Sequence, residues 1–230
     1  MGDVMGMEYP AELDPHSYLS RTELRRFAAE LRIGRGQVLV DIGCGRGGAG
    51  LWVAAETGAD LIGLDIAEAP LVDARQRATC LGVRASFEGG EFERTGLANA
   101  SVDAVMSVDA LLFAPDKAAA FGELRRVLRS GGRLALTSWD YWRQPAGRPP
   151  QVQDHRPIAQ AAGFTILTYE ETAGWRDILE RTGVAMLAAA AELAAESGEP
   201  VEVVRSLLIE ENATIDAMSR RIFLVAEATE

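Results

Sequence analysis

The sequence is short of cysteine, of basic residues and of long apolar runs, and each shortage argues against a class of protein. Two cysteines, Cys44 and Cys80, build neither a disulfide framework nor a zinc-type cysteine cluster, and we expect no metal site. Lysine and arginine total 23 against 34 aspartate and glutamate residues, a net charge of −11, which disfavours nucleic acid or an anionic membrane as partner. The longest apolar run, residues 184–191, is far shorter than the ~20 residues of a spanning helix.

Length and composition favour one soluble globular domain. The chain has 230 residues, of which 48% are hydrophobic and 25% are charged, the usual balance for a folded protein. We expect a single domain with an N-terminal helical cap (1–34), a core (35–140) and a C-terminal part (141–230). The N-terminus shows neither a signal peptide nor, at Gly6, the Ser or Thr of a myristoylation signal. A reduced, cytoplasmic monomer or homodimer is therefore predicted.

Short apolar runs alternate with stretches of helical period, which is typical of a mostly parallel sheet covered by helices. The fold class predicted is α/β, with a doubly wound sheet and helices on both faces. The segment 141–157 holds four of the nine prolines and is predicted to be irregular, and two helices are expected between residues 175 and 219. The expected strands lie at residues 37–43, 59–65, 84–88, 102–108, 133–138, 164–170 and 221–226.

A glycine turn follows the first predicted strand and supports two interpretations. Gly43, Gly45 and Gly48 fit the G-x-G-x-x-G pattern of a dinucleotide site, which would make the protein an NAD(P)-dependent oxidoreductase. Asp41 stands two positions before the first glycine, where its carboxylate would repel a pyrophosphate and attract an ammonium group. S-adenosylmethionine is an amino acid attached to adenosine and carries no phosphate. Asp41 therefore favours S-adenosylmethionine over NAD.

Candidates for binding the adenosine half follow at suitable places in the chain. Asp65 ends the second strand, 20 residues after Gly45, where a carboxylate accepts hydrogen bonds from ribose hydroxyls. Gly90, Glu91 and Phe92 come after the third strand, where a carboxylate can accept from the adenine amino group and an aromatic ring can meet the base. Their order on successive strands makes the combination specific.

Five segments carry a combined pattern: VLVDIGCGRG (38–47), LD (64–65), GEF (90–92), SVDAVMSVD (101–109) and LRSGGRL (128–134). Together they resemble a class I S-adenosylmethionine-dependent methyltransferase, of the small-molecule type 11 group that includes ubiquinone-biosynthesis and sarcosine/dimethylglycine enzymes. The resemblance covers roughly residues 35–140. It implies a Rossmann-like, seven-stranded sheet whose last strand, 221–226, is antiparallel. It departs from the family at Glu91, where Asp is common, and at Ala67, where a Ser often caps the next helix.

The resemblance also implies S-adenosylmethionine as the cofactor and S-adenosylhomocysteine as its product. The residues then expected to bind the cofactor are Asp41, Gly43, Cys44, Gly45, Asp65, Ile66, Gly90, Glu91, Phe92 and Ser107. Cys44 has the alternative of being a small residue tolerated in a tight turn, since no basic partner that would form its thiolate is visible.

The acceptor side is predicted from residues that follow the fourth and fifth strands. His155 suits a general base at neutral pH, and Asp109 could contact cofactor or acceptor. Each has a structural alternative, because His155 could begin a helix and Asp109 could cap a turn. The aromatic residues after the fifth strand could either surround the acceptor or fill the core. The expected walls of the acceptor pocket are His16, Tyr18, Leu111, Trp139, Tyr141 and Trp142.

The function predicted is transfer of a methyl group from S-adenosylmethionine to a small organic acceptor, such as a secondary metabolite, on oxygen, nitrogen or carbon. Two alternatives stay open. One is the NAD(P)-dependent oxidoreductase, and the other is a cofactor-binding protein of methyltransferase fold that transfers no methyl group.

Overall fold

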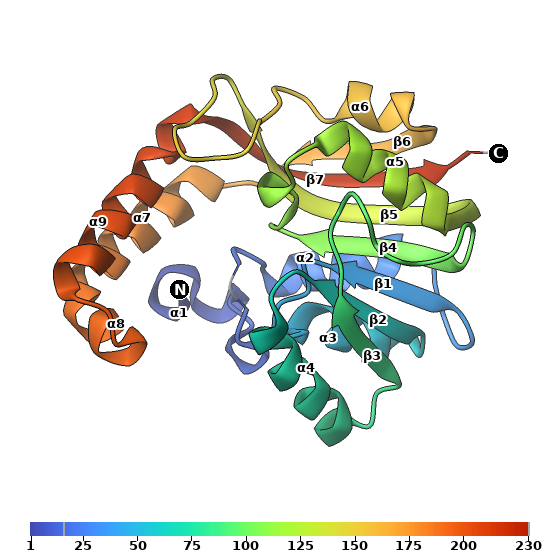
Figure 1. Cartoon of the computed structure of the whole chain (residues 1–230), viewed down its shortest axis with the longest axis horizontal. Helices are drawn as coiled ribbons and strands as arrows, with labels where there is room; N and C mark the ends of the chain where they lie inside the picture. Colours follow the sequence, from blue (N-terminus) through green and yellow to red (C-terminus); the bar gives the residue numbers. More distant parts are fainter. Residues whose placement is uncertain (16, 230) are drawn as a thin grey trace.

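Seven strands form one twisted sheet in the computed structural model, which describes residues 1–15 and 17–229 (Figure 1). The order across the sheet is β3-β2-β1-β4-β5-β7-β6, and β7 is antiparallel to both of its neighbours. This confirms the predicted doubly wound sheet with an antiparallel last strand. The strands are β1 (Val38–Ile42), β2 (Asp60–Asp65), β3 (Ala85–Gly89), β4 (Val102–Val108), β5 (Leu128–Tyr141), β6 (Phe164–Glu171) and β7 (Met218–Ala228).

Helices cover both faces of the sheet (Figure 1). On one face pack α2 (Arg21–Glu30), α3 (Gly48–Thr57) and α4 (Glu68–Leu81), and on the other α5 (Lys117–Val127) and α6 (Arg156–Ala161). A short 3-10 helix, η3 (Leu111–Phe113), follows β4. The N-terminal residues form α1 (Gly2–Met5), η1 (Gly6–Glu8) and η2 (Ala11–Leu13).

The alternation of side chains along the strands divides the apolar residues between two core layers. On β7, Ile222 and Leu224 pack into the layer under α5 and α6, whereas Phe223 and Val225 pack into the layer under α2, α3 and α4. Successive strand residues point to opposite faces, so a strand buried on both sides reads as a continuous apolar run. Burial of these two layers is the main favourable term that holds the helices on the sheet.

The C-terminal region contains three helices where two were predicted. These are α7 (Trp175–Ala188), α8 (Ala190–Ser197) and α9 (Val201–Ala213), followed by the short η4 (Ile215–Ala217). Gly198 ends α8 with a left-handed φ of 75°, and Pro200 precedes α9, which explains the break between these two helices; α7 and α8 are separated at Ala189. We call α7–α9 the helical arm; it stands beside the sheet at the end where β4 and β5 finish (Figure 1). No helix among the described residues is long and apolar enough to span a membrane.

Candidate functional site

The glycine turn between β1 and α3 is fixed by backbone contacts with neighbouring strands. Gly43 and Cys44 donate their amides to the Leu64 carbonyl at 2.8 and 3.0 Å. Gly43 has a φ of +72°, and a Cβ built on it would lie 2.3 Å from the Cβ of Ala110. The close approach of the segment after β4 therefore requires glycine at position 43.

Asp65 links the end of β2 to this turn. One carboxylate oxygen accepts the Gly45 amide at 2.8 Å, and the other accepts the Ala67 amide at 3.0 Å. A carboxylate oxygen can accept more than one hydrogen bond, so both retain capacity for further donors. Ala67 directly precedes α4 and provides no side-chain cap, as expected for alanine at this position. Asp65 thus has a fixed orientation and free acceptor capacity.

Asp41 lies on β1 beneath the turn, with 2% of its surface exposed. Burial raises the pKa of its carboxyl to about 7, the Gly50 amide lowers it in part, and the negative charge of Asp65 raises it further. Helix α3 packs closely against Asp41 at Gly50, where an added Cβ would lie 2.6 Å from an Asp41 carboxylate oxygen. No cationic side chain among the described residues forms an ion pair with Asp41 within 4 Å.

Two cavities meet at the glycine turn and share Gly43, Gly45 and Val108. The first, about 410 Å³, is called the turn cavity, and the second, about 490 Å³, the strand-end cavity. The turn cavity includes Asp14, Pro15, Ser17, Asp41, Cys44, Arg46, Gly48 and Asp73 among its lining residues. The strand-end cavity includes Asp65, Ile66, Gly90, Glu91, Phe92, Glu93, Asp109, Ala110 and Phe113.

The charges around these cavities are mostly negative. Arg46 is the only basic residue that lines either cavity within the described part of the chain, and its guanidinium pairs with Asp14 at 2.5 Å and Asp73 at 3.4 Å. The amides of Gly43, Cys44, Gly45 and Gly47 are all bonded within the protein. A pyrophosphate would therefore meet carboxylates and few free amides, whereas a cationic ligand would be attracted.

Nine of the ten residues expected to bind the cofactor line the two cavities: Asp41, Gly43, Cys44, Gly45, Asp65, Ile66, Gly90, Glu91 and Phe92. Ile66 stands out because 79% of its apolar side chain is exposed at the cavity rim. Burial raises the pKa of the Cys44 thiol, with Asp41 and Asp65 adding to the rise, so Cys44 is a thiol and not a thiolate.

Ser107 is the one residue of these ten that lines neither cavity. Its side chain is fully buried on β4, and its hydroxyl donates to the Ile42 carbonyl at 2.8 Å. That bond joins β4 to β1 inside the sheet, so the hydroxyl is committed to the fold. Val108 and Asp109, the next two residues, are the ones that reach the cavities.

Asp109 is held in a buried ion pair and cannot act as a free base. Arg221 on β7 donates to its two oxygens at 3.1 Å each, and the Tyr18 amide donates to one of them at 2.9 Å. Arg221 also contacts Glu23 at 2.5 Å and the Thr172 hydroxyl at 3.1 Å. Burial opposes the charge on Arg221, but its two carboxylate partners outweigh that cost and raise its pKa. Asp109 is therefore a positioning residue that fastens the N-terminal segment over the cavities.

Arg221 itself is fully buried, which is unusual for an arginine. The signal that could have found it is an arginine beside the apolar run of a buried strand, since such a residue needs a carboxylate partner. Its partners lie 112 and 198 residues away in the chain, so the sequence could not name them.

His155, predicted as the general base, lies inside the protein and lines neither of the two cavities at the glycine turn. Only 1% of its surface is exposed, and Nδ1 lies 2.9 Å from Asp140. The same carboxylate accepts from the Tyr169 hydroxyl at 2.6 Å and from Arg220 at 2.7 Å. His155 also precedes α6, the structural alternative that the sequence allowed. These contacts favour a structural role for His155 in the core over the role of a general base.

Replacing His155 with alanine should cost about 2–4 kcal/mol of unfolding free energy, because it removes a buried ring and one partner of Asp140. Cofactor affinity and turnover should stay within about twofold at temperatures where the protein is folded. Tyr169→Phe removes another donor from Asp140 and should behave in the same way. Thermal unfolding and initial rates check this. A large loss of turnover without a loss of stability would return His155 to the reaction.

A third cavity, about 120 Å³ and called the arm cavity, lies between the sheet and the helical arm. It shares Asp109 and Phe113 with the strand-end cavity and Ser17 with the turn cavity. Tyr18 and Trp139 line it as expected, with their rings edge to face at 6.1 Å. Its other lining residues, not named by the sequence, are Leu112, Leu179, Glu211, Asn212, Thr214, Ile215 and Met218.

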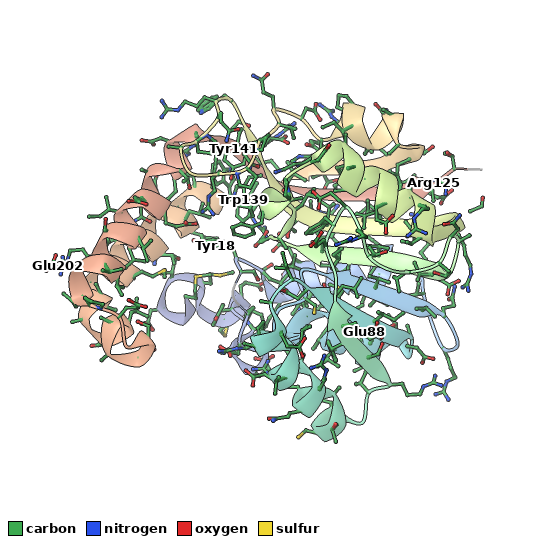
Figure 2. The ribbon with its side chains drawn as sticks, viewed as in Figure 1. Tyr18, Glu88, Arg125, Trp139, Tyr141 and Glu202 are labelled. Carbon is green, nitrogen blue, oxygen red and sulfur yellow. The ribbon has the colours of Figure 1, made fainter. Side chains whose placement is uncertain are left out.

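The other residues expected at the acceptor pocket lie elsewhere or next to it. Tyr141 packs in one apolar cluster with Tyr18 and Trp139, and Figure 2 shows the three side chains between the arm and the sheet. Leu111 is fully buried in the core under α5, so its prediction is wrong. Trp142 is 60% exposed and donates its Nε1–H to the Asp216 carbonyl, outside the arm cavity. His16 lies outside the described residues.

Strand length explains part of this difference. β5 was expected to end at residue 138, but its pairing with β7 continues to Tyr141. Trp139 and Tyr141 are therefore alternate residues of one strand and share a face, while Asp140 points to the opposite face and meets His155. A loop after the strand could have brought all of these residues to one pocket, but a strand cannot.

Residues 40–136 match the family model described as "Methyltransferase domain". Methyltransferase GfsG of Streptomyces halstedii is 30% identical over 129 residues, which are 55% of this chain and 46% of that protein. Phosphoethanolamine N-methyltransferase 3 of Arabidopsis thaliana is 26% identical over 172 residues, 68% of this chain and 35% of that protein. The chain thus spans less than half the length of these curated relatives.

Solved structures share the fold over most of the chain. The [4+2]-cyclase SpnF has a TM-score of 0.78 at 22% identity and covers 90% of this chain and 80% of its own. Geranyl diphosphate C-methyltransferase from Streptomyces coelicolor A3(2) has a TM-score of 0.69 at 16% identity, covering 92% and 79%. At these identities the likeness shows the fold alone.

Proposed function

Because residues 40–136 match the methyltransferase-domain family model, we propose that the chain binds S-adenosylmethionine and transfers its methyl group to a small organic acceptor. The observation that carries the proposal is the pair of carboxylates at the glycine turn. Asp41 is buried, and no cationic side chain of residues 1–15 and 17–229 forms an ion pair with it; Asp65 is oriented by two amides and has acceptor capacity to spare. The ammonium group and the ribose hydroxyls of the cofactor supply the donors that these two carboxylates lack.

The remaining lining residues suit the same ligand. Ile66 exposes an apolar surface in the strand-end cavity, which Phe92 also lines, and an adenine ring would cover that surface. Glu91 is exposed at that rim and can accept from an amino group. The carboxylate-rich lining, in contrast, disfavours the pyrophosphate of NAD(P), and we set that alternative aside.

Asp41 and Asp65 would hold the cofactor, which would supply an electrophilic methyl group on its sulfonium to the electron pair of the acceptor. The chain contributes alignment and exclusion of water. Asp109 accepts a hydrogen bond from the Tyr18 amide and so holds Tyr18 at the cavities. Asp14 forms ion pairs with Arg46 and Arg77, which hold the segment before Tyr18 in place. Such alignment can account for ~7–11 kcal/mol of barrier. Asp109 is ion-paired with Arg221 and His155 is buried away from the cavities, so we assign neither the role of a general base.

Asp65→Ala should weaken binding of S-adenosylhomocysteine by about 2–4 kcal/mol, because the ribose hydroxyls lose a charged acceptor. Glu88→Ala is the matched control, since Glu88 is exposed on β3 and lines neither cavity (Figure 2). Calorimetric titration of both variants measures the difference. Equal affinities in the two variants would place the ribose elsewhere.

Methyl transfer itself is tested with S-adenosylmethionine labelled in its methyl group and a metabolite extract. A labelled product from the wild-type protein, formed roughly ten- to hundredfold more slowly at subsaturating S-adenosylmethionine when Asp41 is replaced by Asn, supports the proposal. Cofactor binding without any labelled product would favour the second candidate, a cofactor-binding protein of this fold with other chemistry. That candidate rests on one observation, the similarity of the fold to a structure described as a [4+2]-cyclase.

The setting of the protein is proposed from its surface and its cysteines. Cys44 and Cys80 are both unpaired, and the net charge is −11, which fits a reduced cytoplasmic compartment and a small-molecule partner. We propose that residues 35–140 hold the cofactor, and that residues 1–34 and 141–230 enclose the acceptor, in a monomer or homodimer.

A further inference from the structure

The loop that joins β4 to α5, residues 109–116, contains η3 and is called the η3 loop. It forms part of the wall of two cavities. From this loop the strand-end cavity is lined by Asp109, Ala110, Phe113, Ala114 and Pro115, and the arm cavity by Asp109, Leu112 and Phe113. Phe113 belongs to both linings, and 56% of its surface is exposed. The position of the η3 loop therefore determines the shape of the strand-end cavity.

The middle of the η3 loop is bonded to the only lysine of the chain. Lys117, the first residue of α5, donates from Nζ to the carbonyls of Leu112 and Ala114 at 3.1 and 2.8 Å. These carbonyls lie directly before and after Phe113. Gln151 donates to the Leu112 carbonyl as well, at 2.8 Å. The backbone on both sides of the exposed aromatic ring is thus held by one ammonium group.

The placement of this ammonium group is costly for the fold. Lys117 is 4% exposed, and its described hydrogen-bond partners are carbonyl groups and not carboxylates. Burial lowers the pKa of its ammonium group to about 8, although the charge of Glu93 opposes the shift. The start of a helix also carries a partial positive charge, which disfavours a cation there. What the protein gains from this placement is the pair of hydrogen bonds to the η3 loop.

The two ends of the η3 loop are fixed by other contacts. Asp109 is ion-paired with Arg221, and the Asp116 amide donates to a Glu93 carboxylate oxygen at 2.9 Å. These contacts do not involve the lysine. Its loss would therefore free the middle of the loop while both ends stay in place.

We infer that Lys117 is a positioning residue: by binding the carbonyls on both sides of Phe113, its ammonium group fixes the wall against which the nucleoside of the cofactor binds. The identity of that ligand rests on the proposed function, whereas the effect on the loop does not. Lys117 itself lines neither the strand-end cavity nor the arm cavity, so it acts through the loop.

Lys117→Met removes the donors and keeps an unbranched side chain. We expect it to weaken binding of S-adenosylhomocysteine and of 5′-methylthioadenosine equally, by roughly three- to tenfold, because the loop must then be ordered when the shared nucleoside binds. The melting temperature of the unliganded protein should change little, since removal of a buried charge offsets the lost hydrogen bonds. A merely structural lysine would show the reverse, a lower melting temperature and an unchanged affinity.

Arg125→Met is the matched control. Arg125 lies in the last turn of α5, far from the helical arm in Figure 2, and its cationic side chain also donates to a backbone carbonyl, that of Thr229. It lines neither the strand-end cavity nor the arm cavity, so this variant should keep the wild-type affinity for both ligands. Calorimetric titration and thermal unfolding of the wild type and the two variants make the comparison.

Hydrogen exchange shows where the change occurs. The amides of Phe113 and Ala114 donate to the carbonyls of Ala110 and Leu111 at 3.0 Å each. In unliganded Lys117→Met both amides should exchange faster than in the wild type, because the loop is no longer held from α5. Saturating 5′-methylthioadenosine should restore their protection.

Wild-type affinity in Lys117→Met, or a loss of the same size in Arg125→Met, overturns the inference. Wild-type exchange rates of the two amides in Lys117→Met overturn it as well. The two proposals fail separately. A wild-type protein that binds neither ligand contradicts the proposed function, and the exchange rates of the unliganded variants still decide whether Lys117 fixes the η3 loop.

Discussion

Replacing Asp41 with asparagine should weaken binding of S-adenosylhomocysteine roughly ten- to hundredfold, about 1.5–3 kcal/mol, while stabilising the unliganded protein. The affinity falls because the ammonium group of the ligand loses a charge-assisted partner. The stability rises because the variant no longer buries a carboxylate away from any cation. A substitution that lowers ligand affinity and raises the stability of the unliganded protein identifies a residue that binds the ligand at a cost in stability.

The pH dependence of the wild-type protein tests independently whether the charge on Asp41 lowers stability and raises ligand affinity. The pKa of Asp41 is about 7 in the folded protein and 3.8 as its ordinary value, so the folded state binds the extra proton between these values. This residue therefore makes unfolding easier as pH rises from about 4 to 7, by on the order of 1–3 kcal/mol. Cofactor affinity should change the other way and fall as pH drops below about 7, because the protonated carboxyl no longer attracts an ammonium group.

The control for Asp41→Asn is 5′-methylthioadenosine, which keeps the nucleoside and lacks the amino-acid arm. Its affinity should be the same in the wild type and the variant. Calorimetry with both ligands at pH 6 and 8, with thermal unfolding of the unliganded protein, completes the test. If both ligands lost affinity equally, Asp41 would act on the shape of the turn and not on the ammonium group.

Arg221→Met should destabilise the protein by about 3–5 kcal/mol, because it leaves Asp109 and Glu23 as uncompensated buried charges. For a chain of this length that corresponds to roughly 10 °C in melting temperature. The N-terminal segment should loosen as well, since the Asp109 oxygen that accepts the Tyr18 amide loses its fixed position. Faster proteolysis before residue 20 would report this.

Two further variants make the test specific. Arg205→Met removes an arginine from the exposed surface of α9 and should change the melting temperature little. Combining Arg221→Met with Asp109→Asn and Glu23→Gln removes the charges together and should recover much of the lost stability. Arg221→Met with wild-type stability would show that the ion pair contributes nothing to fastening the N-terminal segment.

The sequence predicts the sheet and the cofactor side because their signals are local. The strand before the glycine turn, the turn itself and Asp65 lie within 30 residues, and each has a physical reason to be where it is. The alternation of apolar residues on β7 reflects two buried faces in the same way.

The acceptor side depends on long-range contacts, and there the prediction failed for identifiable reasons. His155 and Asp109 have the residue types of a base, but Asp140 and Arg221 occupy them, and only the folded chain brings these pairs together. Trp142 was grouped with Trp139 and Tyr141 because the end of β5 could not be located to within three residues. Successive residues of a strand point to opposite faces, so the position of the strand end decides which of these side chains share a face.

The most direct test of the central claim is one calorimetric experiment in which the wild-type protein is titrated with S-adenosylmethionine and, separately, with NADH. We predict saturable binding of S-adenosylmethionine that is weakened roughly ten- to hundredfold in Asp41→Asn, and no heat of binding with NADH. Tight binding of NADH with no response to S-adenosylmethionine would contradict the assignment of the glycine turn.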